Sequence, residues 1–248
     1  MDRFEGKIAL VTGAGSGIGR AVTNRLAEEG GAVFAVDIDE AALAETADLV
    51  GRPGISLHVA DVSDPDACDA AVASCLQAFG RLDVLGNVAG IYRSAHTPDM
   101  AREDYRRVMS VNLDAPFYLC QAAIPPLLAS GGNIVNIASN SGIMGVPYSA
   151  AYSASKGGII QLTRSLAVEF LKTTLRVNAI APAGTNTNIA ASAGFPSDMD
   201  PDLSGRMLGP RGMAEPGDVA ALFAYLASDE ARAVTGAVYT IDNGITVS

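Results

Sequence analysis

Tyr152 and Lys156 stand four residues apart, with Ser139 upstream of them. In a helix this spacing puts both side chains on one face, where an ammonium group lowers the pKa of a neighbouring phenol. An unperturbed tyrosine has a pKa of about 10, so a fixed positive charge moves it toward the working pH. The pair is a candidate acid/base and its tuning charge. A Tyr and a Lys at this spacing are also common by chance, and without context they indicate only two exposed helix residues.

A glycine-rich run at 12–19 could bind a phosphate group. It reads Thr-Gly-Ala-Gly-Ser-Gly-Ile-Gly and lies where an expected strand becomes an expected helix. Gly13, Gly17 and Gly19 have no Cβ atom, so they permit a tight turn and a close approach of a pyrophosphate to the helix N-terminus. The order GxxxGxG differs from the common GxGxxG and indicates a distinct subgroup of nucleotide-binding folds. The alternative interpretation is a flexible glycine turn.

Asp37 ends the next expected strand, 18 residues after Gly19. An acid at this place binds both hydroxyls of an adenosine ribose and repels a 2′-phosphate. No Arg or Lys lies in the glycine run or directly after Asp37. Both observations predict NAD rather than NADP as the cofactor. The competing role, capping of the following helix, suits Asp39 better.

The elements that must position these residues alternate along the whole chain. Expected strands at 7–12, 32–37, 55–60, 82–87, 133–138, 175–180 and 237–241 alternate with expected helices at 18–29, 40–50, 65–79, within 102–129, 150–171 and 216–227. This alternation predicts an α/β fold: a single-domain Rossmann, doubly wound parallel β-sheet with helices on both faces. We expect residues 1–248 to form one NAD-binding and catalytic domain. The long segment at about 185–215 is expected to be a substrate lid.

Composition excludes several classes of function. The formal net charge is −10, which argues against a nucleic-acid partner, and no run of about 18 apolar residues suggests a membrane span. Cys68, Cys75 and Cys120 are widely spaced and form no CxxC pair, so we expect neither disulfides nor a zinc site. With only His58 and His96, a His-based metal site is disfavoured, and we expect a cytoplasmic protein with no metal.

Taken together, the run 12–19, Asp37, the segment 87–90, Asn112, Ser139 and the pair Tyr152–Lys156 occur in the order found in the short-chain dehydrogenase/reductase family. The chain resembles this family over essentially its full length. The resemblance implies a catalytic tetrad of Asn112, Ser139, Tyr152 and Lys156, with Tyr152 as general acid/base. It also implies that Ser139 orients the substrate oxygen, that Asn112 orders a water relay, and that Lys156 binds the nicotinamide ribose as well as tuning Tyr152.

The same resemblance implies a set of NAD-binding residues. They are Gly13, Ser16, Gly17, Ile18, Gly19, Asp37, Asp61, Val62, Asn87, Ala89, Gly90, Tyr152, Lys156, Pro182, Gly184, Thr185 and Thr187. The chain departs from the family pattern in three places. Gly86 and Val88 flank Asn87 where an aliphatic residue and a second Asn are usual. Ala183 replaces the first Gly of the nicotinamide segment, where a positive φ would strain it, and Asn243 interrupts the usual Asp-Gly-Gly.

The expected activity is hydride transfer between NAD and a secondary alcohol or ketone that is largely apolar. The apolar residues of the loops and lid that suggest this are Ile143, Met144, Val146, Phe195, Met199, Leu203, Met207 and Leu208. The alternatives are a 3-oxoacyl-(acyl-carrier-protein) reductase and an inactive NAD-binding scaffold protein. Family members are commonly tetramers, so we expect a homotetramer in which Gly157 and Gly158 permit close approach of helices.

A serine hydrolase and a calcium-binding protein are two further interpretations, and the sequence supports them less. A serine hydrolase would need a GxSxG elbow, and none occurs. A calcium loop could start at Asp198, Asp200 and Asp202, but Leu203 stands where such a loop needs Gly, and Gly209 where it needs Glu. These carboxylates are therefore expected to be solvated lid residues.

Overall fold

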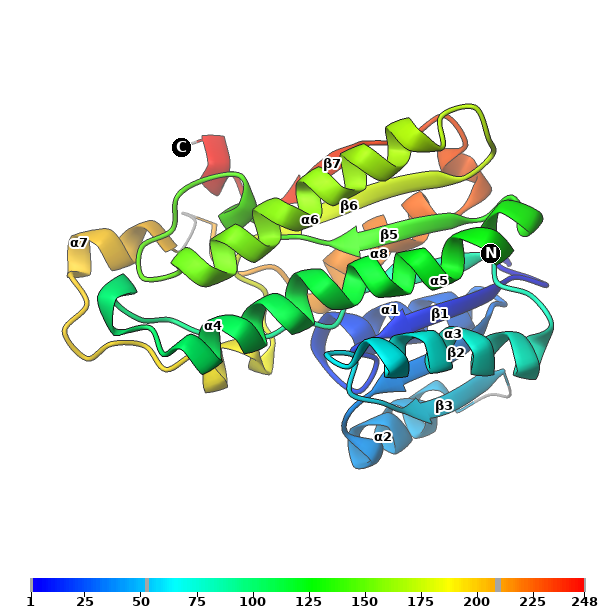
Figure 1. Ribbon diagram of the computed structural model, residues 1–248, viewed down its shortest axis with the longest axis horizontal. Coiled ribbons are helices and arrows are strands. Elements are labelled where there is room, and N and C mark those ends of the chain that lie inside the picture. The colour runs from blue at the N-terminus through cyan, green and yellow to red at the C-terminus, as the bar shows by residue number, and fades with distance from the viewer. Residues whose placement is uncertain (1, 52–53, 208–210, 248) are drawn as a thin grey trace.

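All seven strands belong to one parallel sheet in this computed structural model, which describes residues 2–51, 54–207 and 211–247 (Figure 1). The order is β3-β2-β1-β4-β5-β6-β7. The strands are β1 (Ile8–Thr12), β2 (Ala32–Asp37), β3 (Ile55–Val59), β4 (Val84–Asn87), β5 (Asn133–Ile137), β6 (Arg176–Pro182) and β7 (Val238–Ile241). Every neighbouring pair is parallel. The predicted fold class is confirmed.

Helices cover both faces of the sheet because the central strands are apolar on both sides. In β1, Ala9 and Val11 face one core while Ile8 and Leu10 face the other, as the period of two dictates. The first core packs against α1 (Gly17–Glu28), α2 (Glu40–Val50) and α8 (Pro216–Ala227). The second packs against α3 (Pro65–Phe79), α5 (Ala115–Ser130) and α6 (Ala150–Glu169).

The helix expected within 102–129 is interrupted. It consists of α4 (Arg102–Met109), a π-helical turn at Ser110–Asp114, and α5. Pro116 supplies a physical reason, since a proline has no N–H for the carbonyl four residues earlier, at Asn112, and its ring crowds that carbonyl. The wider turn relieves this conflict at Asn112, and π turns frequently occur at functional sites.

Gly86 has a specific role in packing. A Cβ built on it would lie 2.9 Å from Cζ of Phe223, a fully buried ring on α8. The absence of a side chain at this position of β4 therefore lets the Phe223 ring pack directly on the sheet. This explains one of the three departures from the family pattern: the volume of the missing aliphatic residue is filled from another element.

Gly158 also serves a contact within the chain. Its Cβ would lie 2.9 Å from Cδ1 and from Cδ2 of Leu113 in the π turn, whereas a Cβ on Gly157 would meet only Gly142 O, at 3.7 Å. Gly158 thus lets α6 approach the π turn of its own chain. The expected role of Gly157 and Gly158 in a contact between subunits stays a prediction.

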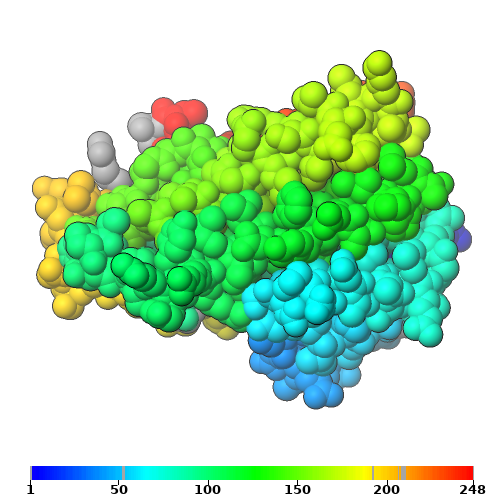
Figure 2. All heavy atoms as spheres, viewed as in Figure 1, coloured from blue at the N-terminus to red at the C-terminus, as the bar shows by residue number. Residues whose placement is uncertain are grey.

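The excursion between β6 and α8 lies beyond the carboxyl ends of the strands. It holds a short 3₁₀ helix at Asn188–Ser192, α7 (Pro201–Ser204) and a 3₁₀ turn at Gly205–Met207. An isolated parallel bridge between Thr185 and Ala214 joins its two stems. In Figure 2 this segment, yellow to orange, forms one end of the molecule beside the blue-green residues near α4. Leu208 and Gly209 lie outside the described residues.

Among residues 2–51, 54–207 and 211–247 no helix is long and apolar enough to cross a membrane.

Candidate active site

Two adjoining cavities open at the carboxyl edge of the sheet, where the strand order reverses between β1 and β4. The first has a volume of about 300 Å³ and lies along β1, β2 and β3. The second has a volume of about 450 Å³ and lies beside β5, β6 and the lid. Both are lined by Ile18, Val88, Gly90, Thr187 and Ile189, so they form one continuous cleft. Such a switch point is where open α/β sheets bind their ligands.

The glycine run forms a tight cradle at one wall of the first cavity. A Cβ on Gly19 would lie 1.9 Å from the carbonyl oxygen of Gly13, and a Cβ on Gly13 would lie 2.8 Å from Cα of Ala89. Gly13 and Gly17 have positive φ values of 67° and 49°. The backbone therefore closes on itself only because side chains are missing, and the N-terminus of α1 is left bare toward the cavity. This is the geometry that a dinucleotide pyrophosphate requires.

Arg20 holds this cradle from behind and was not predicted from the sequence. Its Nε and Nη2 donate to the carbonyl oxygen of Gly15 at 3.0 and 2.5 Å, and Nη2 pairs with Glu45 at 2.6 Å. Its Nε also donates to Oγ1 of Thr46 at 3.0 Å. The guanidinium is thus committed to the loop and to α2. Only the position of Arg20, one residue after the last glycine of the run, could have suggested this role.

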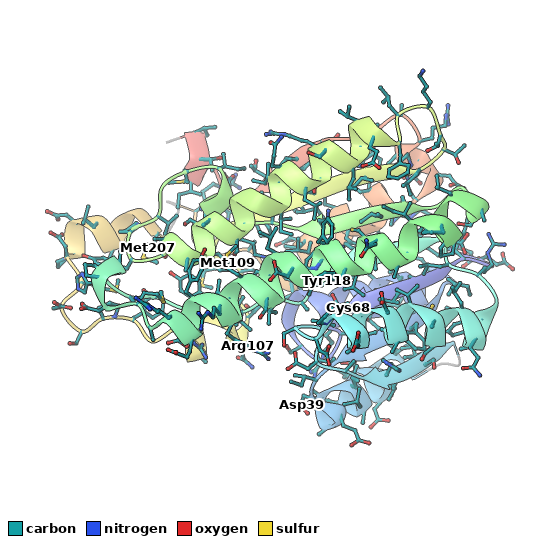
Figure 3. All side chains as sticks on the ribbon, in the orientation of Figure 1. Asp39, Cys68, Arg107, Met109, Tyr118 and Met207 are labelled. Atoms are coloured by element: carbon teal, nitrogen blue, oxygen red, sulfur yellow. The ribbon has the colours of Figure 1, made fainter. Side chains whose placement is uncertain are left out.

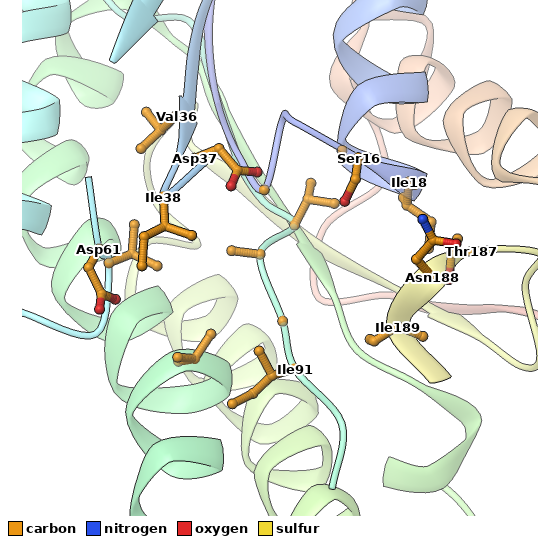
Figure 4. Close-up of a pocket in the computed structure, with 18 of the residues that line it drawn as sticks. Ser16, Ile18, Val36, Asp37, Ile38, Asp61, Ile91, Thr187, Asn188 and Ile189 are labelled. Atoms are coloured by element: carbon orange, nitrogen blue, oxygen red, sulfur yellow. The ribbon is translucent and has the colours of Figure 1, made fainter. Parts of the chain in front are cut away.

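Asp37 lies at the edge of the glycine cradle, between Ile38 on one side and Ser16 on the other, while Asp61 and Thr187 lie toward the two ends of the first cavity (Figure 4). Its Oδ2 accepts a hydrogen bond from the amide of Gly15 at 2.8 Å. The side chain is half-buried, and each carboxylate oxygen keeps a lone pair for a ligand hydroxyl. Asp39 caps α2 by accepting from the amide of Ala42, as expected, so Asp37 is not needed for that task.

Asp61 forms an ion pair at 3.1 Å with Arg107, which projects from α4 (Figure 3). Burial alone would raise the pKa of Asp61, but hydrogen bonds from Ser63 and the guanidinium of Arg107 outweigh it and lower that pKa. Among the described residues that line the first cavity, Arg107 is the one cation, and this pairing uses its charge. The cavity therefore offers no unpaired described cation to a 2′-phosphate.

Asn87 and Asn112 lie behind the cleft rather than in its lining. Asn87 Nδ2 donates to Asn136 Oδ1 at 2.8 Å, and Asn136 Nδ2 donates to Thr163 Oγ1 at 2.9 Å, so the bonds run from β4 through β5 to α6. Asn112 Oδ1 accepts from the amide of Ile91 at 2.8 Å, and Nδ2 donates to the carbonyl of Ile91 at 2.9 Å. Both amides shape the walls of the site.

The segment after β6 carries no strain at Ala183. Among the described residues only Tyr148 and Asn243 are non-glycine residues with positive φ, and the amide of Ala183 donates to the carbonyl of Ile241 at 3.0 Å. Ala183 therefore continues the strand pairing, and the expected strain was wrong. Pro182, Gly184, Thr185 and Thr187, which were expected to contact the nicotinamide, all line the second cavity.

Ser139, Tyr152 and Lys156 meet in the second cavity. Ser139 lies within hydrogen-bonding reach of the Tyr152 hydroxyl, and its own Oγ donates to Asn140 Oδ1 at 3.2 Å. The ammonium of Lys156 lies 5.8 Å from the centroid of the Tyr152 ring. Lys156 is 3% exposed, and its Nζ donates to the carbonyl of Ile137 at 2.7 Å. A Cβ on Gly90 would lie 3.5 Å from that Nζ, so the glycine leaves the ammonium open to the cleft.

The pKa values correct the sequence-based expectation. Burial of its hydroxyl raises the pKa of Tyr152 to about 12, although the residue as a whole is half-buried. The hydrogen bond from Ser139 lowers it only in part, and the neighbouring Tyr92 raises it. Burial also lowers the pKa of Lys156 to about 8. Burial of the Tyr152 hydroxyl thus outweighs the hydrogen bond that lowers its pKa.

The wall of the second cavity is largely apolar. Of the predicted residues, Val146, Phe195, Met199 and Met207 line it, and Ile143, Met144 and Leu203 do not. Tyr92, Ile189 and Met213 belong to the lining as well. Met207 lies at the lid end of the molecule in Figure 3. Among the described lining residues Lys156 is the single charged side chain, so this cavity suits a neutral ligand.

The acidic residues of the lid have structural partners. Asp198 Oδ1 lies 3.0 Å from Nε2 of His96, and the hydrogen bond from His96 lowers the pKa of Asp198. Asp200 caps α7 by accepting from the amides of Asp202 and Leu203. No group of three potential metal ligands occurs in the part of the chain that the structure describes.

Comparison with known proteins was made on the whole chain. A family model described as enoyl-(acyl carrier protein) reductase matches residues 13–246. The chain is 39% identical to the 3-oxoacyl-[acyl-carrier-protein] reductase of Thermotoga maritima, over 99% of this chain and 100% of the relative. It is 38% identical to the 3beta-hydroxysteroid dehydrogenase of Mediterraneibacter gnavus, over 99% and 97%. The crystal structure of a short chain dehydrogenase from Mycobacterium paratuberculosis bound to NAD superposes with a TM-score of 0.91 at 33% identity, covering 99% and 100%.

The buried amine of Lys156 makes a prediction about stability. Its pKa is about 8 in the folded chain, against about 10.4 for an unperturbed lysine. Between these pH values the unfolded chain holds a proton that the folded chain has released, so raising the pH through this range stabilises the fold. Urea unfolding at pH 7 to 10 should therefore show the wild type gaining stability relative to Lys156→Met. Lys172→Met, at an exposed lysine, is the control. If the free energy of unfolding of Lys156→Met changes with pH in parallel with that of the wild type and of Lys172→Met, the prediction is contradicted.

Proposed function

The chain belongs to the short-chain dehydrogenase/reductase family, and from this premise we propose that it transfers hydride reversibly between NAD and a neutral, largely apolar secondary alcohol or ketone. The observation that carries the proposal is the meeting of Ser139, Tyr152 and Lys156 in the second cavity. A proton donor, its hydrogen-bonding partner and a buried cation face an apolar chamber there. This arrangement suits proton transfer to and from a substrate oxygen.

NAD, when bound, accepts or supplies the hydride. We assign its pyrophosphate to the cradle of Gly13, Ser16, Gly17, Ile18 and Gly19, and its adenosine to Asp37, Asp61, Val62, Ala89 and Gly90. Its nicotinamide half is assigned to Tyr152, Lys156, Pro182, Gly184, Thr185 and Thr187. Asn87 and Asn112 act from behind, by fixing β4 to β5 and the loop at Ile91. The glycine cradle and the half-buried Asp37 support this assignment.

The protein's own residues manage the proton. A pKa of about 12 keeps Tyr152 protonated near neutral pH, which suits donation of its proton to the oxygen of a ketone. In the oxidation of an alcohol Tyr152 must take up a proton, and the hydrogen bond from Ser139 and the positive charge of Lys156 stabilise the phenolate that does so. Ser139 has a single hydroxyl proton, which Asn140 Oδ1 accepts at 3.2 Å in this structure. To orient the oxygen of a ketone, Ser139 would donate that proton to the substrate instead.

The reduction of 3-oxoacyl thioesters is the second candidate. It is supported by the 39% identity to the 3-oxoacyl-[acyl-carrier-protein] reductase of Thermotoga maritima. The net charge of −10 disfavours an acidic carrier protein as partner, and loss of catalysis in a scaffold protein is disfavoured by the intact tetrad. Assaying acetoacetyl-coenzyme A beside a panel of secondary alcohols, with NADH and NAD respectively, distinguishes the two substrates.

A homotetramer in the cytoplasm completes the proposal. Three thiols are free and buried, in accord with a reducing compartment. Phe117, Val168 and Leu171 are 48%, 71% and 66% exposed on the outer sides of α5 and α6 and in the turn that follows, and such apolar exposure suits a subunit interface. We expect light scattering to give the mass of four chains, and a monomer at micromolar concentration would contradict this.

The assignment of Tyr152 predicts a specific loss. Tyr152→Phe removes the proton donor and leaves the ring, so kcat should fall by at least about 10²-fold while the Kd for NADH changes by less than about threefold. Stopped-flow turnover and NADH fluorescence titration measure the two quantities. Tyr118→Phe, at a half-buried tyrosine of α5 that lines neither cavity, is the control. Substantial turnover by Tyr152→Phe would rule out Tyr152 as the acid/base.

The assignment of Asp37 predicts the cofactor preference. The carboxylate repels a 2′-phosphate, so the wild type should strongly prefer NAD, and Asp37→Ser should reduce the NAD/NADP ratio of kcat/KM at least about tenfold. Asp39→Ser changes the charge equally and keeps a residue that can cap α2, so its ratio should stay near that of the wild type. An NADP preference of the wild-type enzyme would exclude the proposed role of Asp37.

A further inference from the structure

We propose that Tyr92 is a positioning residue that holds the ring of Tyr152 in place and links it to the lid. The inference rests on the proposed function, because it concerns the orientation of the acid/base. Tyr92 lies in the loop after β4, is 8% exposed, and lines the second cavity. Neither spacing nor motif draws attention to it, and its role follows from three contacts.

The first contact is with Tyr152 itself. The two rings meet edge to face, with centroids 4.8 Å apart and an interplanar angle of 87°. This is the favoured geometry for an aromatic pair, worth about 0.5–1.5 kcal/mol beyond burial of area. Because a phenol must present its hydroxyl to the substrate within a narrow range of angles, a ring fixed against its edge or face restricts Tyr152 to productive orientations.

The second contact fixes Tyr92. Its hydroxyl lies 2.5 Å from Oγ of Ser149, a fully buried residue that precedes the first turn of α6. Ser149 donates its own proton to the carbonyl of Pro147 at 3.0 Å. The proton between the two hydroxyls therefore comes from Tyr92, which is bound to the start of the helix that carries Tyr152. The side chain of Tyr92 therefore contacts both the ring of Tyr152 and the start of α6.

The third contact reaches the lid. The ring of Tyr92 lies 5.7 Å from that of Phe195, and two residues after Tyr92 the amide of Ser94 donates to the carbonyl of Ala193 at 2.7 Å. On the other side, Ile91 is bound through its amide and carbonyl to Asn112. The loop that carries Tyr92 is thus bound to Asn112 of the π turn just before Tyr92 and to Ala193 of the lid just after it. Displacement of the lid at Ala193 and Phe195 removes support from Tyr92 and, through it, from Tyr152.

Kinetics of variants test this link. Tyr92→Leu should lower kcat at least about tenfold with less than a threefold change in the KM for NAD, because the ring that supports Tyr152 is lost. Tyr92→Phe keeps the ring and should retain at least about a third of wild-type kcat. Ser149→Ala removes the same hydrogen bond from its other end and should match Tyr92→Phe. Tyr239→Leu, a tyrosine 37% exposed on β7, is the matched control.

A double-mutant cycle tests the coupling to the lid. Phe195→Leu should lower kcat in the wild-type background and have little further effect in Tyr92→Leu. Additive losses, or a change in substrate KM with kcat intact, would overturn the proposal and make Tyr92 only part of the cavity wall. Retention of NADH binding and of the thermal unfolding midpoint shows that a variant is folded.

A spectroscopic measurement separates this inference from the proposed function. In protein labelled with ¹³C at the tyrosine ring, the Tyr152 resonance is assigned by its loss in Tyr152→Phe. We expect Tyr92→Leu to shift or broaden that resonance whether or not any alcohol is turned over, and Tyr239→Leu to leave it unchanged. An unaltered Tyr152 resonance in Tyr92→Leu would refute the positioning role. If Tyr92→Leu alters the resonance but the wild-type protein turns over no substrate, only the proposed reaction is refuted.

Discussion

The reversal of strand order between β1 and β4 is the constraint on which the site depends. The connection that leaves β1 packs on one face of the sheet and the helices after β4 pack on the other, so the two loops separate and the sheet edge is left open between them. Because all strands are parallel, the segments following Thr12, Asp37, Asn87, Ile137 and Pro182 reach this one edge. Residues some 170 positions apart in sequence therefore share a single cleft.

The parts of this arrangement that depend on local chemistry were predictable from the sequence. Apolar strands, glycines at a strand-to-helix turn and an acid at a strand end each carry their own physical reason. The rest depends on contacts that spacing does not encode. Burial of Tyr152 is produced by several elements together, which is why its raised pKa was not foreseen. The commitment of Arg20 to Gly15 and the position of Tyr92 against Tyr152 likewise appear only when distant segments meet.

Lys156 shows how chemistry competes with stability in this fold. An ammonium has three protons to donate, and the described residues give it one acceptor, the carbonyl of Ile137. Desolvating a charge with so few partners is unfavourable, and the surrounding structure must tolerate it. The buried chain of bonds from Asn87 through Asn136 to Thr163 fixes α6 to the sheet beside this cation. The sheet thus supplies the rigidity that a charge in this position requires.

The stems of the lid have a consequence for its motion. The two stems are joined by the bridge between Thr185 and Ala214. The second stem is also tied to the turn after β7, where Nδ2 of Asn243 donates to the carbonyl of Gly212 at 2.9 Å. Asn243 adopts a positive φ of 51°, which asparagine tolerates, and it adds a tether that a glycine at this turn could not supply. Thr185 and Ala214 are buried, at 8% and 6% exposure, whereas the hydrogen bond from Asn243 lies at the surface. The base of this segment is therefore anchored in the core, and we expect any opening to begin beyond these contacts, at a free energy far below that of global unfolding.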